Sequence, residues 1–304
     1  VGSDREIMQL VGDDTRIIDV DGRAVIPGIT DAHLHPQKAA LSEYRRDIPD
    51  IRSLFELLGW IKSQTQSKEK GEWIIYPKMF FSRLVDMRPL TLAELDSVSP
   101  DHPVFLNGAY GGLINTEAMA ISGINEETNH RGVLKDKETG KCTGFIRASA
   151  FDLLKLPSRQ PLSTDKKVQL IRDMFDRYHQ YGITSVCSGA GDLEDYQLYR
   201  EMHDNGELTM RIFQNILFPL PDEIKLDKLN EQLDSLDCVT GDGDRWVRIG
   251  ALKIFLDGGI LTGTAYLREP WGEKACNFFR ISDNDTDYRG VINFTRKELL
   301  PIVQ

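Results

Sequence analysis

The sequence predicts an α/β fold built on a parallel sheet, in an arrangement that matches the first half of a (β/α)8 TIM barrel with an insertion. Two observations predict it. After residue 160, apolar strands alternate with amphipathic helices, which is typical of right-handed βαβ units. Before that region, a further apolar strand ends near residue 35, and residues 41–160 separate it from the others. Counting this strand, the chain supplies four of the eight strands that a closed barrel requires.

Residues 1–26 are expected to form a small sheet edge outside the barrel half. Two short β-rich runs, 7–10 and 16–20, are separated by Gly12-Asp13-Asp14 and followed by Asp21-Gly22. Turn-forming residues between β-rich runs are typical of short strands.

Residues 27–40 carry a strand in which Asp31, His33 and His35 alternate with apolar residues. Side chains two residues apart in a strand project to the same side, so these three are expected on one face. Two neighbouring imidazoles suit a divalent metal of the zinc type. The alternative is that both histidines are hydrogen-bonded core residues, because a short motif of this kind also arises by chance.

Residues 41–160 have a mixed pattern and are interpreted as an insertion subdomain after the first barrel strand. Helices are expected over 54–62 and 91–96, and a strand over 103–106. A hairpin is expected where 132–134 and 144–146 flank a polar turn.

Residues 161–304, together with 27–40, are assigned to the barrel half. Ser163 or Thr164 can cap a helix whose apolar residues recur at helical spacing, and Gly182 ends it. The elements that follow are expected to be strands over 183–187, 210–218 and 246–256, and helices over 193–203 and 223–236.

The last of these strands contains Lys253 in phase with Ala251, Phe255 and Asp257. Burying an ammonium group is costly unless it is paired or neutralised. A buried lysine is pushed toward its neutral amine, which is nucleophilic and can capture carbon dioxide as a carbamate that bridges two cations. The alternative is a lysine paired with Asp257 or a glutamate for structural reasons, and strand position alone favours neither.

Composition excludes some classes of partner. The formal net charge of −10 argues against nucleic acid, and also against docking on an anionic membrane. No apolar run is long enough to span a bilayer, and the first residues do not resemble a signal peptide. The four cysteines form no Cys-x-x-Cys pair, which favours reduced thiols in a cytoplasmic protein.

Six segments together resemble the metal-dependent amidohydrolase superfamily, in particular its YtcJ-like branch, which includes N-substituted formamide deacylases. They follow the order of the family and extend almost from end to end of the chain. The segments are 22–35, 94–104, 115–124, 143–147, 182–186 and 252–265.

The resemblance implies a TIM barrel with a small β-sandwich built from both chain ends. It also implies a centre of one or two divalent metals, preferably zinc, held by His33, His35 and a carboxylated Lys253. The substrate pocket is expected to include Asp257 and Tyr110.

The sequence departs from the family pattern at several positions. Tyr110 replaces a histidine common in the family, and Ala148 and Ser188 replace acidic residues. The later metal-binding histidines and the catalytic aspartate of the family have no counterpart before residue 304. Specificity is therefore expected to have diverged, and the chain is expected to cover only the first part of the family's length.

The function expected on this basis is metal-dependent hydrolysis of an amide-type C–N bond in a small molecule, such as an N-acyl, N-formyl or cyclic amide. The alternative is a truncated or degenerate homologue that binds or regulates without turnover. The other histidines are interpreted as surface or capping residues. A homo-oligomer is compatible with the sequence.

Overall fold

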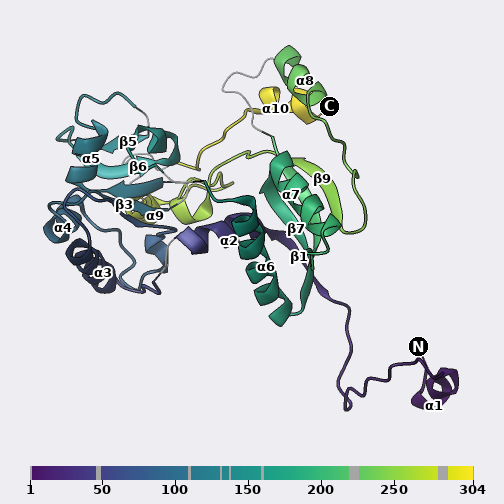
Figure 1. Ribbon diagram of the computed structural model, residues 1–304. Coiled ribbons are helices and arrows are strands. Elements are labelled where there is room, and N and C mark those ends of the chain that lie inside the picture. The colour runs from purple at the N-terminus through teal and green to yellow at the C-terminus, as the bar shows by residue number, and fades with distance from the viewer. Residues whose placement is uncertain are drawn as a thin grey trace.

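The computed structural model contains two separate β-sheets joined by helices and loops (Figure 1). It describes residues 2–45, 49–108, 111–130, 132–136, 138–158, 161–218, 226–279 and 287–303.

The first sheet has four parallel strands in the order β1-β7-β8-β9. Consecutive order with parallel pairing is what repeated βαβ units produce, so the prediction of a parallel α/β sheet is confirmed. Within the described ranges the sheet is open, and these four strands do not close into a barrel. The strands are β1 (Ile29–Leu34), β7 (Ile183–Gly191), β8 (Arg211–Leu217) and β9 (Val247–Lys253).

Helices follow or precede these strands, and the first three of them cover one face of the sheet (Figure 1). The Ser163 hydroxyl accepts a hydrogen bond from the Lys166 amide and so caps α6, and Gly182 follows the helix with φ +77°. The helices of this part are α2 (Pro36–Arg45), α6 (Thr164–Gln180), α7 (Leu193–Asp204) and α8 (Leu226–Asp234).

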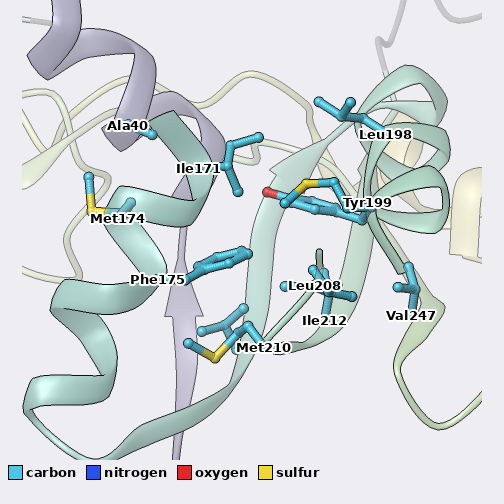
Figure 2. Close-up of a cluster of buried hydrophobic side chains, with 12 residues drawn as sticks. Ala40, Ile171, Met174, Phe175, Leu198, Tyr199, Leu208, Met210, Ile212 and Val247 are labelled. Carbon is cyan, nitrogen blue, oxygen red and sulfur yellow. The ribbon is translucent and has the colours of Figure 1, made fainter. Parts of the chain in front are cut away.

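The core between these helices and the sheet is apolar (Figure 2). Phe175 of α6 and Tyr199 of α7 are almost fully buried, with ring centroids 6.3 Å apart, and Ile212 of β8 packs beneath them. Burying one such side chain stabilises the fold by about 2 kcal/mol. This packing determines which face of the sheet the helices cover.

The second sheet is formed by residues between α2 and α6. Its order is β2-β3-β4-β6-β5, with one parallel pair and three antiparallel pairs. The β5–β6 pair is the hairpin that the sequence predicts. The strands are β2 (Ile74–Tyr76), β3 (Val104–Asn107), β4 (Gly111–Ile114), β5 (Val133–Lys135) and β6 (Cys142–Arg147).

Three α-helices and two 3-10 helices accompany this sheet. The predicted helix at 54–62 is present and longer, and the one at 91–96 begins after its Thr91 cap. The helices are α3 (Leu54–Ser67), η2 (Phe81–Arg83), α4 (Leu92–Val98), α5 (Thr116–Ser122) and η3 (Ala148–Leu153).

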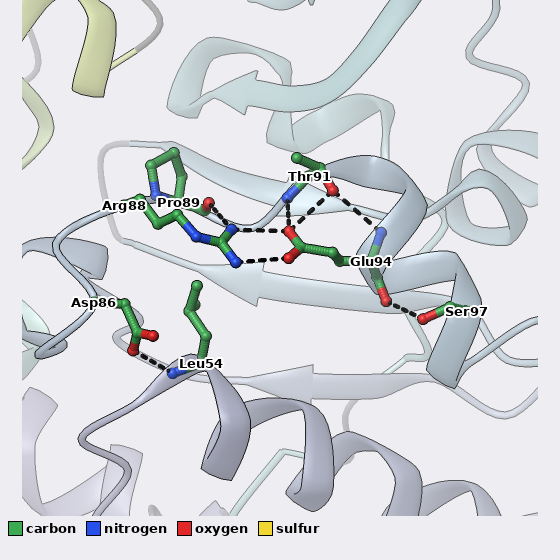
Figure 3. A network of polar contacts seen from close by, with 7 residues as sticks. All are labelled: Leu54, Asp86, Arg88, Pro89, Thr91, Glu94 and Ser97. Carbon is green, nitrogen blue, oxygen red and sulfur yellow. Dashed lines mark hydrogen bonds and ion pairs between the residues drawn. The ribbon is translucent and has the colours of Figure 1, made fainter.

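Two polar residues of the family-like segments, Glu94 and Asn115, have structural roles here. The Glu94 carboxylate accepts hydrogen bonds from the Thr91 amide and hydroxyl. It also accepts hydrogen bonds from the Arg88 guanidinium on both of its oxygens (Figure 3). Hydrogen bonding to Arg88 is the largest cause that lowers the pKa of Glu94, to about 2. Asn115 is fully buried and joins α4, β3 and α5 through its side-chain amide.

The N-terminal segment differs from the prediction. Residues 7–10 are helical, at the end of α1 (Asp4–Ile7) and in η1 (Met8–Leu10), and residues 16–20 are not in a strand. This segment extends away from both sheets in Figure 1, so no described strand lies beside it to accept its backbone hydrogen bonds. The two predicted strands are therefore wrong, because β-rich side chains need a pairing partner to form a strand.

The chain after β9 also differs from the prediction. The strand ends at Lys253 and not at residue 256, so Phe255 and Asp257 lie beyond it. The remaining elements are η4 (Ile260–Thr262), α9 (Glu273–Phe278) and α10 (Arg296–Val303). No helix in the described part of the chain is both long and apolar enough to cross a bilayer.

Candidate metal centre

The two imidazoles of the His-x-His motif lie together where β1 ends. His33 is in β1 and His35 stands between this strand and α2. Their ring centroids are 5.5 Å apart, with an angle of 84° between the ring planes. The carboxyl ends of parallel strands are the usual place for a site in α/β proteins.

The strand is not regular at this point. Asp31 pairs with Val186 and Leu34 pairs with Ser188, so β1 carries one residue more than β7 between these pairs. The Asp31 Oδ1 atom accepts a hydrogen bond of 3.0 Å from the His33 amide. Simple alternation of Asp31, His33 and His35 is therefore interrupted by a bulge, and the Asp31 carboxylate is engaged by the backbone.

The imidazole rings of His33 and His35 both lie against Gly189 of β7. A Cβ atom built on Gly189 would stand 2.7 Å from His33 Nε2 and 3.0 Å from His35 Cε1. Sequence reasoning missed this residue. The signal was present, because a glycine inside a strand often marks a close approach by another group.

His35 has an environment that favours its neutral form. Its pKa is lowered first by burial and then by the positive charges of Lys38, His33 and Lys253. Its Nδ1 atom is buried, and no hydrogen-bond partner for it is found among the described residues. A neutral imidazole with an unpartnered nitrogen is the state that binds a metal.

Lys253 is the last residue of β9, paired in register with Leu217 of β8. The sequence predicts a buried lysine inside the strand. In the structure Lys253 is only half-buried, because the strand ends there. Its ammonium lies over the Phe255 ring, with Nζ 5.1 Å from the ring centroid. The positive charge of Lys253 is the smallest of the causes that lower the pKa of His35.

The alternative of a structural Lys253–Asp257 pair is not seen in the described residues. The Asp257 carboxylate instead accepts a 2.9 Å hydrogen bond from the Tyr266 amide, and Asp257 forms a β-bridge with Ile292. Tyr110, the other residue predicted for the substrate pocket, lies outside the described residues.

The remaining histidines lie elsewhere. His102 is buried beside the Asn115 network, and His179 contacts the Ile183 carbonyl and the Thr209 hydroxyl. His130 accepts a hydrogen bond from the Gly132 amide, and His203 lies 3.3 Å from the Asp204 carboxylate.

His33 and His35 supply two imidazole donors of the kind that a divalent metal binds. Within the described ranges no cluster of three or more His, Cys, Asp or Glu side chains is placed to bind a metal. Protein zinc sites use three or four ligands, so His33 and His35 need a further donor. A carbamate of Lys253 could provide it, and the unpartnered His35 Nδ1 fits such a centre.

Comparison with known proteins gives a consistent picture. The amidohydrolase family matches residues 16–302 of this chain. An N-substituted formamide deformylase of Arthrobacter pascens is 28% identical over 266 residues, which are 84% of this chain and 48% of the relative. The YtcJ protein of Bacillus subtilis, provisionally named an amidohydrolase, is 25% identical over 283 residues, which are 90% of this chain and 51% of the relative.

A solved structure supports the fold. The chain resembles an uncharacterised metal-dependent hydrolase from Pyrococcus horikoshii, with a TM-score of 0.54 and 21% identity over 98% of this chain and 54% of that one. The chain spans about half the length of the curated relatives it matches.

Proposed function

This chain belongs to the amidohydrolase family, and from that premise we propose that it hydrolyses an amide-type C–N bond of a small molecule with a divalent metal. An N-formyl, N-acyl or cyclic amide is the proposed substrate, by analogy with the formamide deformylase that it resembles.

One observation carries this proposal most directly. His33 and His35 lie together over Gly189, and burial together with nearby positive charges lowers the pKa of His35. This arrangement keeps a nitrogen lone pair available at the end of a parallel sheet, whereas a purely structural histidine in a core is normally satisfied by hydrogen bonds.

In the proposed centre, His33 and His35 would hold the metal, with zinc as the preferred ion. A carbamate, formed when the Lys253 amine adds carbon dioxide and releases a proton, would supply oxygen donors to the same centre. When bound, such a metal polarises an amide carbonyl and brings the pKa of a water molecule toward neutrality. Asp257 and Tyr110 are proposed to line the substrate pocket.

The whole protein is proposed to be a cytoplasmic enzyme with a complete (β/α)8 barrel. In it, residues 27–40 and 161–304 would form the first half of that barrel and residues 41–160 an insertion subdomain. Residues 1–26, whose described part contains no strand in this structure, would join a small β-sandwich only together with a later part of the whole protein. We propose neither a nucleic acid nor a membrane as a partner, and a homo-oligomer is compatible with the proposal.

The test is a metal and activity assay on the longest available form of the protein. Lys253→Ala is expected to lower metal content, measured by inductively coupled plasma mass spectrometry, and to abolish hydrolysis in a screen of formamides, N-acyl amines and cyclic amides. Short carboxylates added to this variant are expected to restore part of the activity, because they can replace the carbamate oxygens.

Lys62→Ala is the matched control, since Lys62 is an exposed lysine on α3. It should retain the metal and the activity of the unmodified protein. Unchanged metal content and activity in Lys253→Ala would reject the bridging role of this lysine.

A further inference from the structure

A pocket lies between the second sheet and the chain that follows β9. Five phenylalanine residues contribute to its wall, and it is called the phenylalanine pocket below: Phe80, Phe81, Phe145, Phe278 and Phe279. We infer that this pocket binds an apolar carboxylate, a small molecule that carries an aryl or alkyl group a few bonds from a carboxylate.

The aromatic residues come from distant parts of the chain and meet in space. Phe81 and Phe145 are in edge contact, with ring centroids 6.4 Å apart, and Phe278 and Phe279 are in edge contact at 4.8 Å. All five phenylalanines are half-buried and line the phenylalanine pocket. Such walls favour an aryl or alkyl group by area burial and ring packing.

One charged side chain lines this apolar pocket. Of the described residues in its wall, Arg147 alone carries a charge. No described group accepts a hydrogen bond from its guanidinium, although its backbone pairs with Gly111 and Gly132. A guanidinium binds a carboxylate through two parallel hydrogen bonds, and it does so more strongly where apolar surroundings exclude water.

The other polar groups in the wall are already engaged. The Thr264 hydroxyl accepts a hydrogen bond from the Gly259 amide, and the Thr262 hydroxyl donates to the Gly259 carbonyl. A bound molecule would therefore find one free charged partner and an aromatic wall, and this pairing favours an anionic apolar molecule over a neutral polar one.

A short segment of the chain leads from the candidate metal centre to the phenylalanine pocket. Thr262 and Thr264 of its wall follow Lys253 and Asp257 in the same stretch of chain. If the proposed function holds, the apolar carboxylate is the part of the amide substrate that lies beside the scissile bond; this identification rests on the proposed function, whereas binding to the pocket does not.

The experiment is calorimetric titration of the whole chain with 3-phenylpropionate and with 3-phenylpropionamide, which has the same shape without the charge. We expect saturable binding of the carboxylate, about tenfold tighter than binding of the amide. Arg147→Leu should weaken binding of the carboxylate by about tenfold and leave the amide within a factor of two, since a charged hydrogen bond is worth about tenfold in affinity.

A second variant and two controls keep the test decisive. Phe145→Ala should weaken binding of both probes. Arg172→Leu, which removes an exposed arginine of α6 that pairs with Glu207, should change the binding of neither. His33→Ala should bind 3-phenylpropionate as the unmodified protein does, so that loss of activity and loss of pocket binding are separable.

The inference is overturned if neither probe binds, if both bind equally, or if Arg147→Leu binds the carboxylate as well as the unmodified chain. Circular dichroism establishes that each variant is folded. Should Arg147→Leu fail to fold, Arg147→Lys replaces it, with a smaller loss of carboxylate affinity expected because the charge remains and the fork is lost.

Discussion

The His33 imidazole lies so close to Gly189 that a single added carbon on the glycine would stand 2.7 Å from Nε2. Gly189 belongs to β7, whereas His33 belongs to the neighbouring strand β1. The position of the two histidine rings is thus determined by the absence of a side chain on the adjacent strand.

Gly189→Ala is expected to displace both imidazoles and to weaken metal binding by about 10- to 100-fold, the range found when the groups that orient metal ligands are altered. Zinc affinity measured by competition with a chromogenic chelator checks this. Gly59→Ala is the matched control, because a Cβ there meets nothing within 4 Å in the middle of α3. It should leave zinc affinity unchanged and raise the free energy of unfolding by about 0.5–1 kcal/mol. Equal zinc affinity in Gly189→Ala and the unmodified chain would contradict the close contact.

The lowered pKa of His35 predicts how the free energy of unfolding of the metal-free protein depends on pH. The pKa of this histidine in the folded state lies below the ordinary value of 6.5, chiefly because of burial. Between the two values the unfolded chain binds more protons than the folded one, so the free energy of unfolding falls as the pH drops below about 6.5 toward the lowered pKa.

Urea unfolding at a series of pH values, in the presence of a chelator, measures this effect. His35→Gln should show a flatter decline of the free energy of unfolding through that pH range, because glutamine does not titrate. Parallel curves for the variant and the unmodified chain would show that His35 does not carry the effect.

Replacement of Asn115 is expected to cause a large loss of stability. Its Oδ1 atom accepts hydrogen bonds from the amides of Val104 and Ala118, and its Nδ2 group donates to the carbonyls of Ser99 and His102. Asn115→Ala removes all four and leaves buried backbone groups without partners, so we expect a loss of about 3 kcal/mol in the free energy of unfolding.

Chemical denaturation followed by circular dichroism measures this loss. Asn125→Ala is the control, since Asn125 is exposed and caps a surface turn through Glu127; it should cost less than about 1 kcal/mol. A loss of similar size in both variants would contradict the role of Asn115 as the junction of α4, β3 and α5.

Much of the local structure follows from patterns in the chain. Ser163 and Gly182 bound α6 as their chemistry predicts, and the β5–β6 hairpin forms where a polar turn separates two apolar runs. Glu94 and Asn115 lie in segments that resemble the family, but their structural roles depend on hydrogen bonds to residues of other segments, which the sequence alone does not reveal.

The periodicity and spacing of residues along the chain were sufficient to predict a parallel α/β sheet and a paired His33 and His35, because helix caps, strand alternation and turn residues act over a few positions. The tertiary structure alone decided the bulge at Asp31, the contact with Gly189, the half-buried place of Lys253 and the meeting of Phe81 with Phe145. These depend on which strands lie side by side and on which face the helices cover, and contacts between residues far apart in the chain leave no periodic signal in the sequence.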